Sequence, residues 1–434
     1  MQTMCSKERL YTIGLIISEK LRVKANEWKN GIHRWRLYLW HYLRMSSYSL
    51  CWYMWQQTMA MKTRSRLIVL VFALGFTHMA IDYIYTNEDD LYVYSDKEEL
   101  QLEKAELSAT FVMIVGYARS GSSWLGEILS EAEESFYMFE PMQRPLAEGY
   151  YTSNLVCFNN NSYRKPLSLM ERHDFMITTI HRVFTCQFSK LHLFSQEILV
   201  RHQVRMHPGT FTHCKDFNSY TSYFCIKELE RICMSKTHRI VKTIRVTMEL
   251  VSNMIELWPN LKVVHLVRDP RAMTYSRMRG ADFQMAVSSV IHSADMCTRM
   301  YEDIKYDWYI QRKYPGRLII VSYEALADSP YAATGYVYDF LNILFREKTW
   351  FWVYNSMRNK NESETHYYAT VRFNSTKVAN RWRTNIDYHK SQEVDLSCAH
   401  VYKALGYIPL KSEEDLRSET IRTRKKVDRI EGYL

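Results

Sequence analysis

A segment rich in glycine and serine at residues 116–123 (GYARSGSS) has the composition of an anion-binding loop. It follows an apolar run and opens a stretch with helical spacing. Backbone N–H groups at the start of a helix point outward and carry partial positive charge, so they hold anions. Gly121 lets the chain turn tightly beside such an anion, and Arg119 adds a permanent cation with forked donors. The hydroxyl donors of the segment are Ser120, Ser122 and Ser123.

The same segment has the spacing of the nucleotide-binding motif G-x-x-x-x-G-K-[ST], but Ser122 stands where lysine is expected. In nucleoside triphosphatases that lysine reaches the β- and γ-phosphates, while a carboxylate holds Mg²⁺. Its absence argues against a nucleotide kinase or triphosphatase, which Mg²⁺-dependent ATP turnover would support, and favours an anion cradle without metal. The structural alternative is a tight strand–helix turn with capping serines.

A second candidate anion site is the segment 261–278 (LKVVHLVRDPRAMTYSRM). A buried strand delivers Arg268 at its end, and Asp269 with Pro270 ends the strand and starts a helix. Ser276 lies two turns along that helix, so Arg268 and Ser276 are placed to face one phosphate group. The structural alternative pairs Arg268 with Asp269 locally and leaves Ser276 on the surface.

Apolar runs that alternate with helical patterns must position these two segments. The predicted strands are residues 111–115, 239–246, 261–267 and 318–323, and the predicted helices are 124–130, 248–257, 283–313 and 331–344. This alternation indicates an α/β fold with a P-loop-like central parallel sheet flanked by helices. Ligands of such sheets bind at the carboxyl ends of the strands, and both candidate anion sites begin where a predicted strand ends.

Taken together, the two segments resemble those of the Golgi carbohydrate sulfotransferase family, in its galactose/N-acetylglucosamine/N-acetylgalactosamine (Gal/GlcNAc/GalNAc) 6-O-sulfotransferase branch. Residues 118–129 (ARSGSSWLGEIL) are similar to the family's 5′-phosphosulfate loop, and residues 265–277 (HLVRDPRAMTYSR) to its 3′-phosphate element. Further similar stretches are FYMFEP at 136–141, IVKTIRV at 240–246, LIIVSYEALADSP at 318–330, NRWR at 380–383, and Cys398 followed by LGY at 405–407. The resemblance covers residues 108–410 and includes a cysteine-bearing insert between the two segments.

This resemblance implies an enzyme that transfers a sulfuryl group from the donor PAPS (3′-phosphoadenylyl sulfate) to a hydroxyl group. The implied acceptor is the 6-hydroxyl of Gal, GlcNAc or GalNAc in a glycan or proteoglycan chain, with no metal. The implied donor contacts are Arg119, Ser120, Gly121, Ser122, Ser123 and Trp124 to the 5′-phosphosulfate, Arg268 and Ser276 to the 3′-phosphate, and Arg383 closing over the nucleotide. Arg119 is also expected to stabilise the charge that sulfuryl transfer spreads over equatorial oxygens. For Arg383, a salt-bridged surface position is the alternative.

A general base is needed to take the proton of the acceptor hydroxyl. Glu140 follows a predicted short strand at 136–139 and precedes Pro141, and it comes 17 residues after Ser123, so it can return to the same cleft. The resemblance also points to this Glu-Pro pair, which makes Glu140 the expected catalytic base; a surface glutamate is the alternative. Weaker candidates are His173, His181 and His213, because related cytosolic enzymes use a histidine.

The N-terminal residues have the pattern of a membrane anchor with a basic flank. Residues 1–66 contain twelve Lys or Arg and three Glu, a net charge of +9, which leaves +1 for the remaining 368 residues. Because the body lacks a strongly basic surface, a nucleic-acid partner is not expected. Residues 67–86 are apolar enough for a marginal spanning helix, and their basic flank places the N-terminus in the cytosol. A buried core helix is the alternative.

These patterns predict a single-pass type II membrane protein, and the resemblance implies that the membrane is that of the Golgi. Its parts are a cytoplasmic basic extension (1–66), a transmembrane signal-anchor (67–86), a stem (87–107), a luminal sulfotransferase domain (108–410) and a charged, solvated tail (411–434). The N-glycosylation sequons at Asn160, Asn361 and Asn374 all follow the anchor. Seven of the nine cysteines also follow it, enough for up to three disulfides with one thiol left over.

Two other functions stay open at this point: transfer to protein tyrosine, and a catalytically silent luminal glycan-binding protein. The same donor loop would serve a tyrosine acceptor, but the RDPRA sequence at 268–272 resembles the carbohydrate branch. The presence of Arg119, Glu140 and Arg268 argues against a silent protein. The acceptor sugar, the disulfide pairing and a homodimer are also left open.

Overall fold

The computed structural model describes residues 109–143, 156–157, 163–164, 169–207, 214, 219–279, 289–358, 370 and 374–425. The cytoplasmic extension, signal-anchor and stem predicted at 1–66, 67–86 and 87–107 fall outside these residues, as do Asn160, Asn361 and His213. Within the described ranges, no helix combines the length and the apolar character that crossing a membrane requires.

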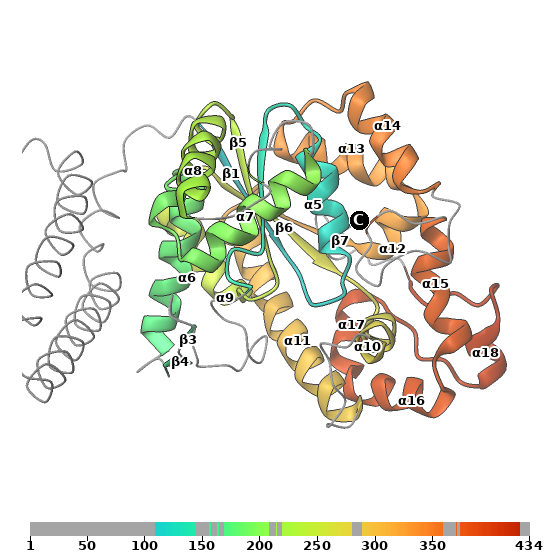
Figure 1. Ribbon diagram of the computed structural model, residues 1–434. Helices are drawn as coiled ribbons and strands as arrows, with labels where there is room; N and C mark the ends of the chain where they lie inside the picture. Colours follow the sequence, from blue (N-terminus) through green and yellow to red (C-terminus); the bar gives the residue numbers. More distant parts are fainter. Residues whose placement is uncertain are drawn as a thin grey trace, which may run out of the picture. The chain divides into compact units, whose positions relative to one another are not determined.

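Five parallel strands form the centre of the described body (Figure 1). They are β1 (Thr110–Val115), β2 (Ser135–Phe139), β5 (His238–Thr243), β6 (Leu261–Val267) and β7 (Leu318–Ser322), in the spatial order β2-β5-β1-β6-β7. Their side chains are almost all buried, as expected for a parallel sheet covered on both faces. The predicted parallel α/β sheet is therefore confirmed. A separate antiparallel pair consists of β3 (Val156–Cys157) and β4 (Tyr163–Arg164).

Helices cover both faces of the sheet. One core contains residues from α6 (Leu169–Phe184), α7 (Leu193–Met206), α8 (Ser219–Met234), α9 (Met248–Leu257), α11 (Ser289–Lys313), α16 (Tyr388–Ser397) and α17 (Ala399–Leu405). The other core contains residues from α5 (Ser122–Ser130), α12 (Tyr323–Asp328), α13 (Pro330–Leu341), α14 (Glu347–Ser356) and α15 (Ser375–Asn385). The shorter elements are η1 (Phe188–Lys190), α10 (Pro270–Met278) and α18 (Glu413–Arg417).

The central strand β1 divides its side chains between the two cores. Phe111, Met113 and Val115 enter the first core, and Val112 and Ile114 enter the second. A strand imposes this alternation because successive side chains point to opposite faces. The strand is thereby fully buried, and the loop that follows it starts from a rigid base.

One predicted strand ends earlier than expected. The β-rich run at 239–246 stops being a strand at Thr243, and the chain turns over the next three residues. The carbonyls of Ile244 and Val246 accept hydrogen bonds from Arg299 on α11 at 3.0 and 2.7 Å. A buried arginine from a distant helix thus donates hydrogen bonds to carbonyls that, in a longer strand, would accept them from neighbouring strands.

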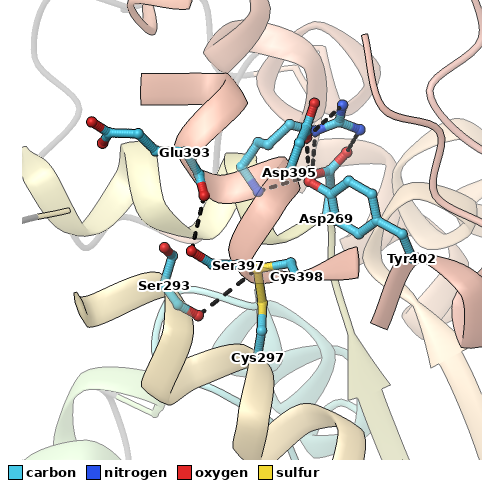
Figure 2. Close-up of a disulfide and its surroundings, with 9 residues drawn as sticks. Asp269, Ser293, Cys297, Glu393, Asp395, Ser397, Cys398 and Tyr402 are labelled. Carbon is cyan, nitrogen blue, oxygen red and sulfur yellow. Dashed lines mark hydrogen bonds and ion pairs between the residues drawn. A yellow bond between two sulfur atoms is a disulfide. The ribbon is translucent and has the colours of Figure 1, made fainter. Parts of the chain in front are cut away.

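Three disulfides link the six cysteines Cys186–Cys233, Cys214–Cys225 and Cys297–Cys398. This agrees with the prediction of up to three disulfides. The third disulfide joins α11 to the residue that follows α16, and Figure 2 shows the Cys398 Sγ pointing toward the Ser293 carbonyl, 3.8 Å away. It ties the C-terminal helices to the long helix that packs under the sheet.

Candidate active site

The two candidate anion segments meet at one edge of the sheet. Strands β1 and β6 are adjacent, with Val115 paired to His265, so the loops that follow them start side by side. The next strand in sequence after β1 is β2, on one side of it with β5 between them, whereas β6 and β7 lie on the other side. Open α/β sheets bind ligands at such a switch point, outside the carboxyl ends of the strands.

The first loop, residues 116–123, is closed by its own hydrogen bonds. Tyr117 N donates to Ser120 Oγ at 3.2 Å, and Ser120 N donates to the Tyr117 carbonyl at 3.0 Å. Gly121 has φ +92°, and a Cβ there would lie 2.3 Å from the Tyr323 ring, so only glycine fits. Helix α5 begins at the next residue, and glycine as its N-cap has no side chain to occupy the first amides, which is an arrangement that suits an anion.

The second loop follows β6, and Asp269 turns the chain there into α10. The Asp269 carboxylate accepts the Arg271 N–H at 2.9 Å and pairs with the Arg271 guanidinium at 2.8 Å. The local pair between Arg268 and Asp269, considered as an alternative, is therefore not formed. Arg268 lies instead over the Tyr323 ring at 4.2 Å, and its Nε has no hydrogen-bond partner among the described residues. A buried donor in this state fits a guanidinium that receives an anionic ligand.

Three arginines tie the two loops together. Arg119 Nε donates to Ser276 Oγ at 3.0 Å, so the first loop contacts the helix of the second. Arg268 Nη1 donates to the Arg119 carbonyl at 3.0 Å, and Arg277 Nε donates to the Ala118 carbonyl at 3.1 Å. Arg119 also has φ +71°, which a non-glycine residue adopts only where its surroundings hold it. The structure thus brings Arg119, Arg268 and Ser276 into one site.

The first turn of α5 carries the remaining predicted donor contacts, Ser122, Ser123 and Trp124. Ser122 is buried and Ser123 is half-buried. The Trp124 ring packs edge-on against Tyr323, with 6.2 Å between centroids, and its Nε1 donates to Ser356 Oγ at 3.2 Å. The indole N–H is therefore engaged by α14, and the ring forms part of the wall behind the first loop.

Glu140 lies directly after β2, with both carboxylate oxygens in ion pairs. Its Oε1 is 2.5 Å from Lys242 Nζ, and its Oε2 is 2.6 Å from Arg245 Nη1. All three side chains are 3–5% exposed, so the surface glutamate considered as an alternative is wrong. Like the arginine of the first loop, Glu140 is a non-glycine residue with positive φ, at +42°. We call Glu140, Lys242 and Arg245 the Glu140 cluster.

Lys242 connects the Glu140 cluster electrostatically to the first loop. Burial lowers the pKa of Lys242, Glu140 opposes that shift, and Arg245 and Arg119 add to it. An effect of Arg119 on this pKa means that the first loop and the cluster lie in one local field.

Arg383 has a different set of partners from the one expected. Its guanidinium donates to the main-chain carbonyls of Asp415, Leu416, Ser418 and Ile421. This uses four of its five N–H donors, and the residue is 7% exposed. In this structure Arg383 anchors the C-terminal segment and is not a surface residue, while its predicted closing over the nucleotide stays a prediction. The described part of the predicted solvated tail, residues 411–425, is mostly exposed or half-buried, with Leu416 buried and Lys425 N bonded to the Gly406 carbonyl at 2.7 Å.

Among the remaining candidate bases, His181 does not lie near the two loops. His181 stacks on Trp258, with 5.9 Å between ring centroids, and Trp258 packs against Phe111 at the start of β1. This is the amino end of the sheet, opposite the loops. His173 is half-exposed on the same helix, α6. In the part of the chain that the structure describes, no group of three or more His, Cys, Asp or Glu could hold a metal ion.

Four side chains at this site were not among the predicted contacts: Lys242, Arg245, Arg277 and Tyr323. Lys242 and Arg245 fall in the stretch 240–246 that carries part of the resemblance, and Tyr323 closes a predicted strand, so signals of position existed. Their partners come from distant parts of the chain, however, and no sequence pattern indicates which distant group each one contacts.

Comparisons with known proteins identify a family and several relatives. A family model described as the sulfotransferase domain matches residues 109–406. The chain is 26% identical to carbohydrate sulfotransferase 1 of Rattus norvegicus, over 72% of this chain and 82% of that protein. It is 23% identical to carbohydrate sulfotransferase 6 of Homo sapiens, over 71% of this chain and 83% of that protein.

Among solved structures, the sulfotransferase domain of the Synechococcus PCC 7002 olefin synthase aligns with a TM-score of 0.39 at 15% identity, over 68% of this chain and 96% of that one. The family model carries the assignment, because it matches well over half of the chain and spans the five-stranded sheet and both anion loops. This chain belongs to the sulfotransferase family.

Proposed function

We propose that this protein is a PAPS-dependent carbohydrate sulfotransferase that sulfates the 6-hydroxyl of Gal, GlcNAc or GalNAc in a glycan or proteoglycan chain. The observation that carries the proposal is the joining of the two anion loops through Arg119 and Arg268, at the ends of neighbouring strands. PAPS carries a 5′-phosphosulfate and a 3′-phosphate on one adenosine, so two adjoining anion sites suit it better than a nucleotide without the 3′ group. The names of the relatives, carbohydrate sulfotransferases, support a glycan acceptor.

On the donor side, the first amides of α5 and the guanidinium of Arg119 would hold the 5′-phosphosulfate. Arg268 and Ser276 would hold the 3′-phosphate, and the Arg268 Nε without a partner supplies a donor for it. When bound, PAPS supplies the sulfuryl group, and transfer spreads negative charge over its oxygens. Donors fixed in place before the reaction stabilise that charge without reorganising.

On the acceptor side, Glu140 would take the proton of the sugar hydroxyl. Each of its carboxylate oxygens has two lone pairs, and one ion pair uses one of them. An acceptor hydroxyl can therefore donate to Glu140 without breaking the contacts to Lys242 and Arg245. Those two cations hold the carboxylate at one orientation, which a positioned base requires.

The compartment we propose is the Golgi lumen, with residues 67–86 as a type II signal-anchor. The three disulfides support an oxidising compartment, because such bonds form outside the reducing cytosol. Detergent extraction and protease protection of the full chain in sealed microsomes test this placement. Protease digestion of residues 109–425 in sealed microsomes without detergent would contradict this placement.

Transfer of labelled sulfate from PAPS to a panel of defined oligosaccharides tests the proposed activity. The panel holds Gal-, GlcNAc- and GalNAc-terminated chains, their 6-deoxy analogues and a tyrosine peptide. We expect label on one or more of the sugars and none on the matching 6-deoxy analogue. Label on the peptide alone would indicate a protein tyrosine acceptor, and binding of glycan without transfer would indicate a silent glycan-binding protein.

A further inference from the structure

A buried polar network lies beneath the first loop, apart from the side chains that would face the donor. Its centre is the carboxylate of Asp303 on α11. Its Oδ2 accepts the Tyr117 hydroxyl at 3.0 Å and Arg299 Nε at 3.3 Å. Its Oδ1 accepts the Met248 N–H at 2.8 Å. One side chain therefore contacts both the first loop and the start of α9.

His265 on β6 and Asp307 on α11 complete the network on the loop side. His265 Nε2 lies 3.0 Å from the Tyr117 hydroxyl, and His265 Nδ1 lies 2.7 Å from Asp307 Oδ2. Because the Tyr117 hydroxyl donates to Asp303, it accepts from an N–H at His265 Nε2. Burial works to lower the pKa of His265, but Asp307 outweighs it and the pKa is raised. The exposed fractions of Tyr117, His265, Asp303 and Asp307 are all at most 2%.

Arg299 extends the network to the turn after β5. Its two terminal nitrogens donate to the carbonyls of Ile244 and Val246. Between these two residues stands Arg245, whose guanidinium pairs with Glu140 at 2.6 Å. The same buried carboxylate thus holds the first loop directly and, through Arg299, the turn that carries one partner of the proposed base.

We propose that Tyr117, Asp303 and Arg299 are positioning residues that fix the spacing between the donor loop and the Glu140 cluster. The predicted effects on kcat and on the KM for PAPS rest on the proposed function. Polar networks in which the members satisfy one another hold a single arrangement in a low-dielectric interior. A misplacement of about 1 Å between reacting groups costs about 10²-fold in rate. Breaking the network therefore lowers kcat, while donor affinity stays near that of the wild type because the phosphate contacts are unchanged.

Tyr117→Phe is the sharpest test, since it removes one hydroxyl and keeps the ring. The matched control is Tyr338→Phe, which removes another fully buried tyrosine hydroxyl that donates to the Ile128 carbonyl at 2.8 Å, in the other core. Both variants are compared by melting temperature, by calorimetric binding of adenosine 3′,5′-bisphosphate (PAP), and by kcat and KM for PAPS per PAP-binding site.

We expect kcat of Tyr117→Phe to fall by about tenfold or more, with the dissociation constant of PAP within about threefold of wild type. Tyr338→Phe should keep wild-type kcat per site. Arg299→Lys keeps the charge but loses the fork that reaches both carbonyls, and should show the same selective loss of kcat. Equal kcat in Tyr117→Phe and Tyr338→Phe, or a loss confined to PAP affinity, would overturn the proposal.

Amide hydrogen exchange gives a readout that does not depend on turnover. Tyr117→Phe should raise exchange both in the first loop and at residues 244–246, and Tyr338→Phe should raise it in neither. Unchanged exchange at 244–246 overturns the coupling. If the wild type transfers no sulfuryl group to any acceptor, the proposed function fails, and the exchange measurement still decides whether the network couples the two segments.

Discussion

The two anion loops and the Glu140 cluster lie along the same edge of the sheet, yet their cations are held in different ways. In the loops, Arg268 contacts a carbonyl and an aromatic ring, because Asp269 pairs with Arg271. In the cluster, one carboxylate is held between two cations at 2.5 and 2.6 Å. The Arg268 guanidinium is hydrogen-bonded to a carbonyl and stacked on a ring, whereas the cluster offsets half of its positive charge through ion pairs.

This difference matches the two tasks of a group transfer. A guanidinium without an ion pair to a carboxylate attracts an anionic ligand, whereas a carboxylate fixed by two cations is held for a single proton. Both regions also store backbone strain, since Arg119 and Glu140 have positive φ. Residues in such conformations persist where the structure around them determines their position, and they cluster at functional sites.

The largest expected effect is on donor affinity, which should depend on the loops and not on the Glu140 cluster. Arg119→Ala and Arg268→Ala should each weaken PAP binding by about 10³-fold, since each removes charge-assisted hydrogen bonds worth about 1.5–3 kcal/mol apiece. Calorimetry measures the affinity, with Arg312→Ala on the exposed side of α11 as a control that should bind normally. Affinity like the wild type in either loop variant would remove that arginine from the donor site.

Glu140→Gln tests the Glu140 cluster, where the expected effects are on turnover and stability. We expect normal PAP affinity, a kcat lower by about 10²-fold, and a free energy of unfolding lower by about 3 kcal/mol, because Lys242 and Arg245 lose their buried carboxylate. The double variant Glu140→Gln with Lys242→Met should regain part of the stability and none of the kcat. Full activity in Glu140→Gln would exclude it as the base.

Removing the Cys297–Cys398 disulfide tests whether the donor loops depend on the C-terminal helices. Replacing both cysteines with serine should lower the free energy of unfolding by about 3 kcal/mol, because a long loop of the unfolded chain is released. Donor affinity should stay unchanged at 25 °C, since Arg119, Arg268 and Ser276 are held by contacts between the two loops. Urea unfolding and PAP calorimetry measure the two quantities, and weaker PAP binding would show that the donor loops depend on the C-terminal helices.

The smallest effect is expected beside the cluster, at His202, which stacks on Phe139 with 5.4 Å between centroids. Burial lowers its pKa from 6.5 to about 3, and Arg205, His207 and Lys242 act in the same direction. Between pH 6.5 and about pH 3 the unfolded chain binds a proton that the folded protein does not, so stability falls as the pH drops. Moving from pH 7.5 to pH 5 should cost about 2 kcal/mol at this residue.

Urea unfolding of His202→Gln at both pH values tests that assignment. The variant should lose about 2 kcal/mol less than the wild type over the same interval, since it has no group to protonate. Wild type and variant with the same pH dependence would mean that His202 accepts a proton in the folded protein.

Much of the site could be predicted because its signals are local. Gly121 allows a turn that other residues cannot make, and Arg268 ends an apolar run that can only be a buried strand. The partners of Arg383, four carbonyls of the C-terminal segment, were not predicted because such partners have no signature in sequence. The end of β5 at Thr243 was misjudged for the same reason, since Arg299 is far away along the chain.

The amino-acid sequence by itself determined the alternation of strands and helices, the two loop sequences and the number of cysteines available for pairing. These follow from side-chain volume, hydrophobic period and backbone freedom, which act over a few residues. Only the tertiary structure decided that β1 lies between β5 and β6, that Arg119 meets Ser276, and that Glu140 stands between two cations. Such contacts depend on which distant surfaces pack together, and packing selects among many pairings that are equally compatible with local chemistry.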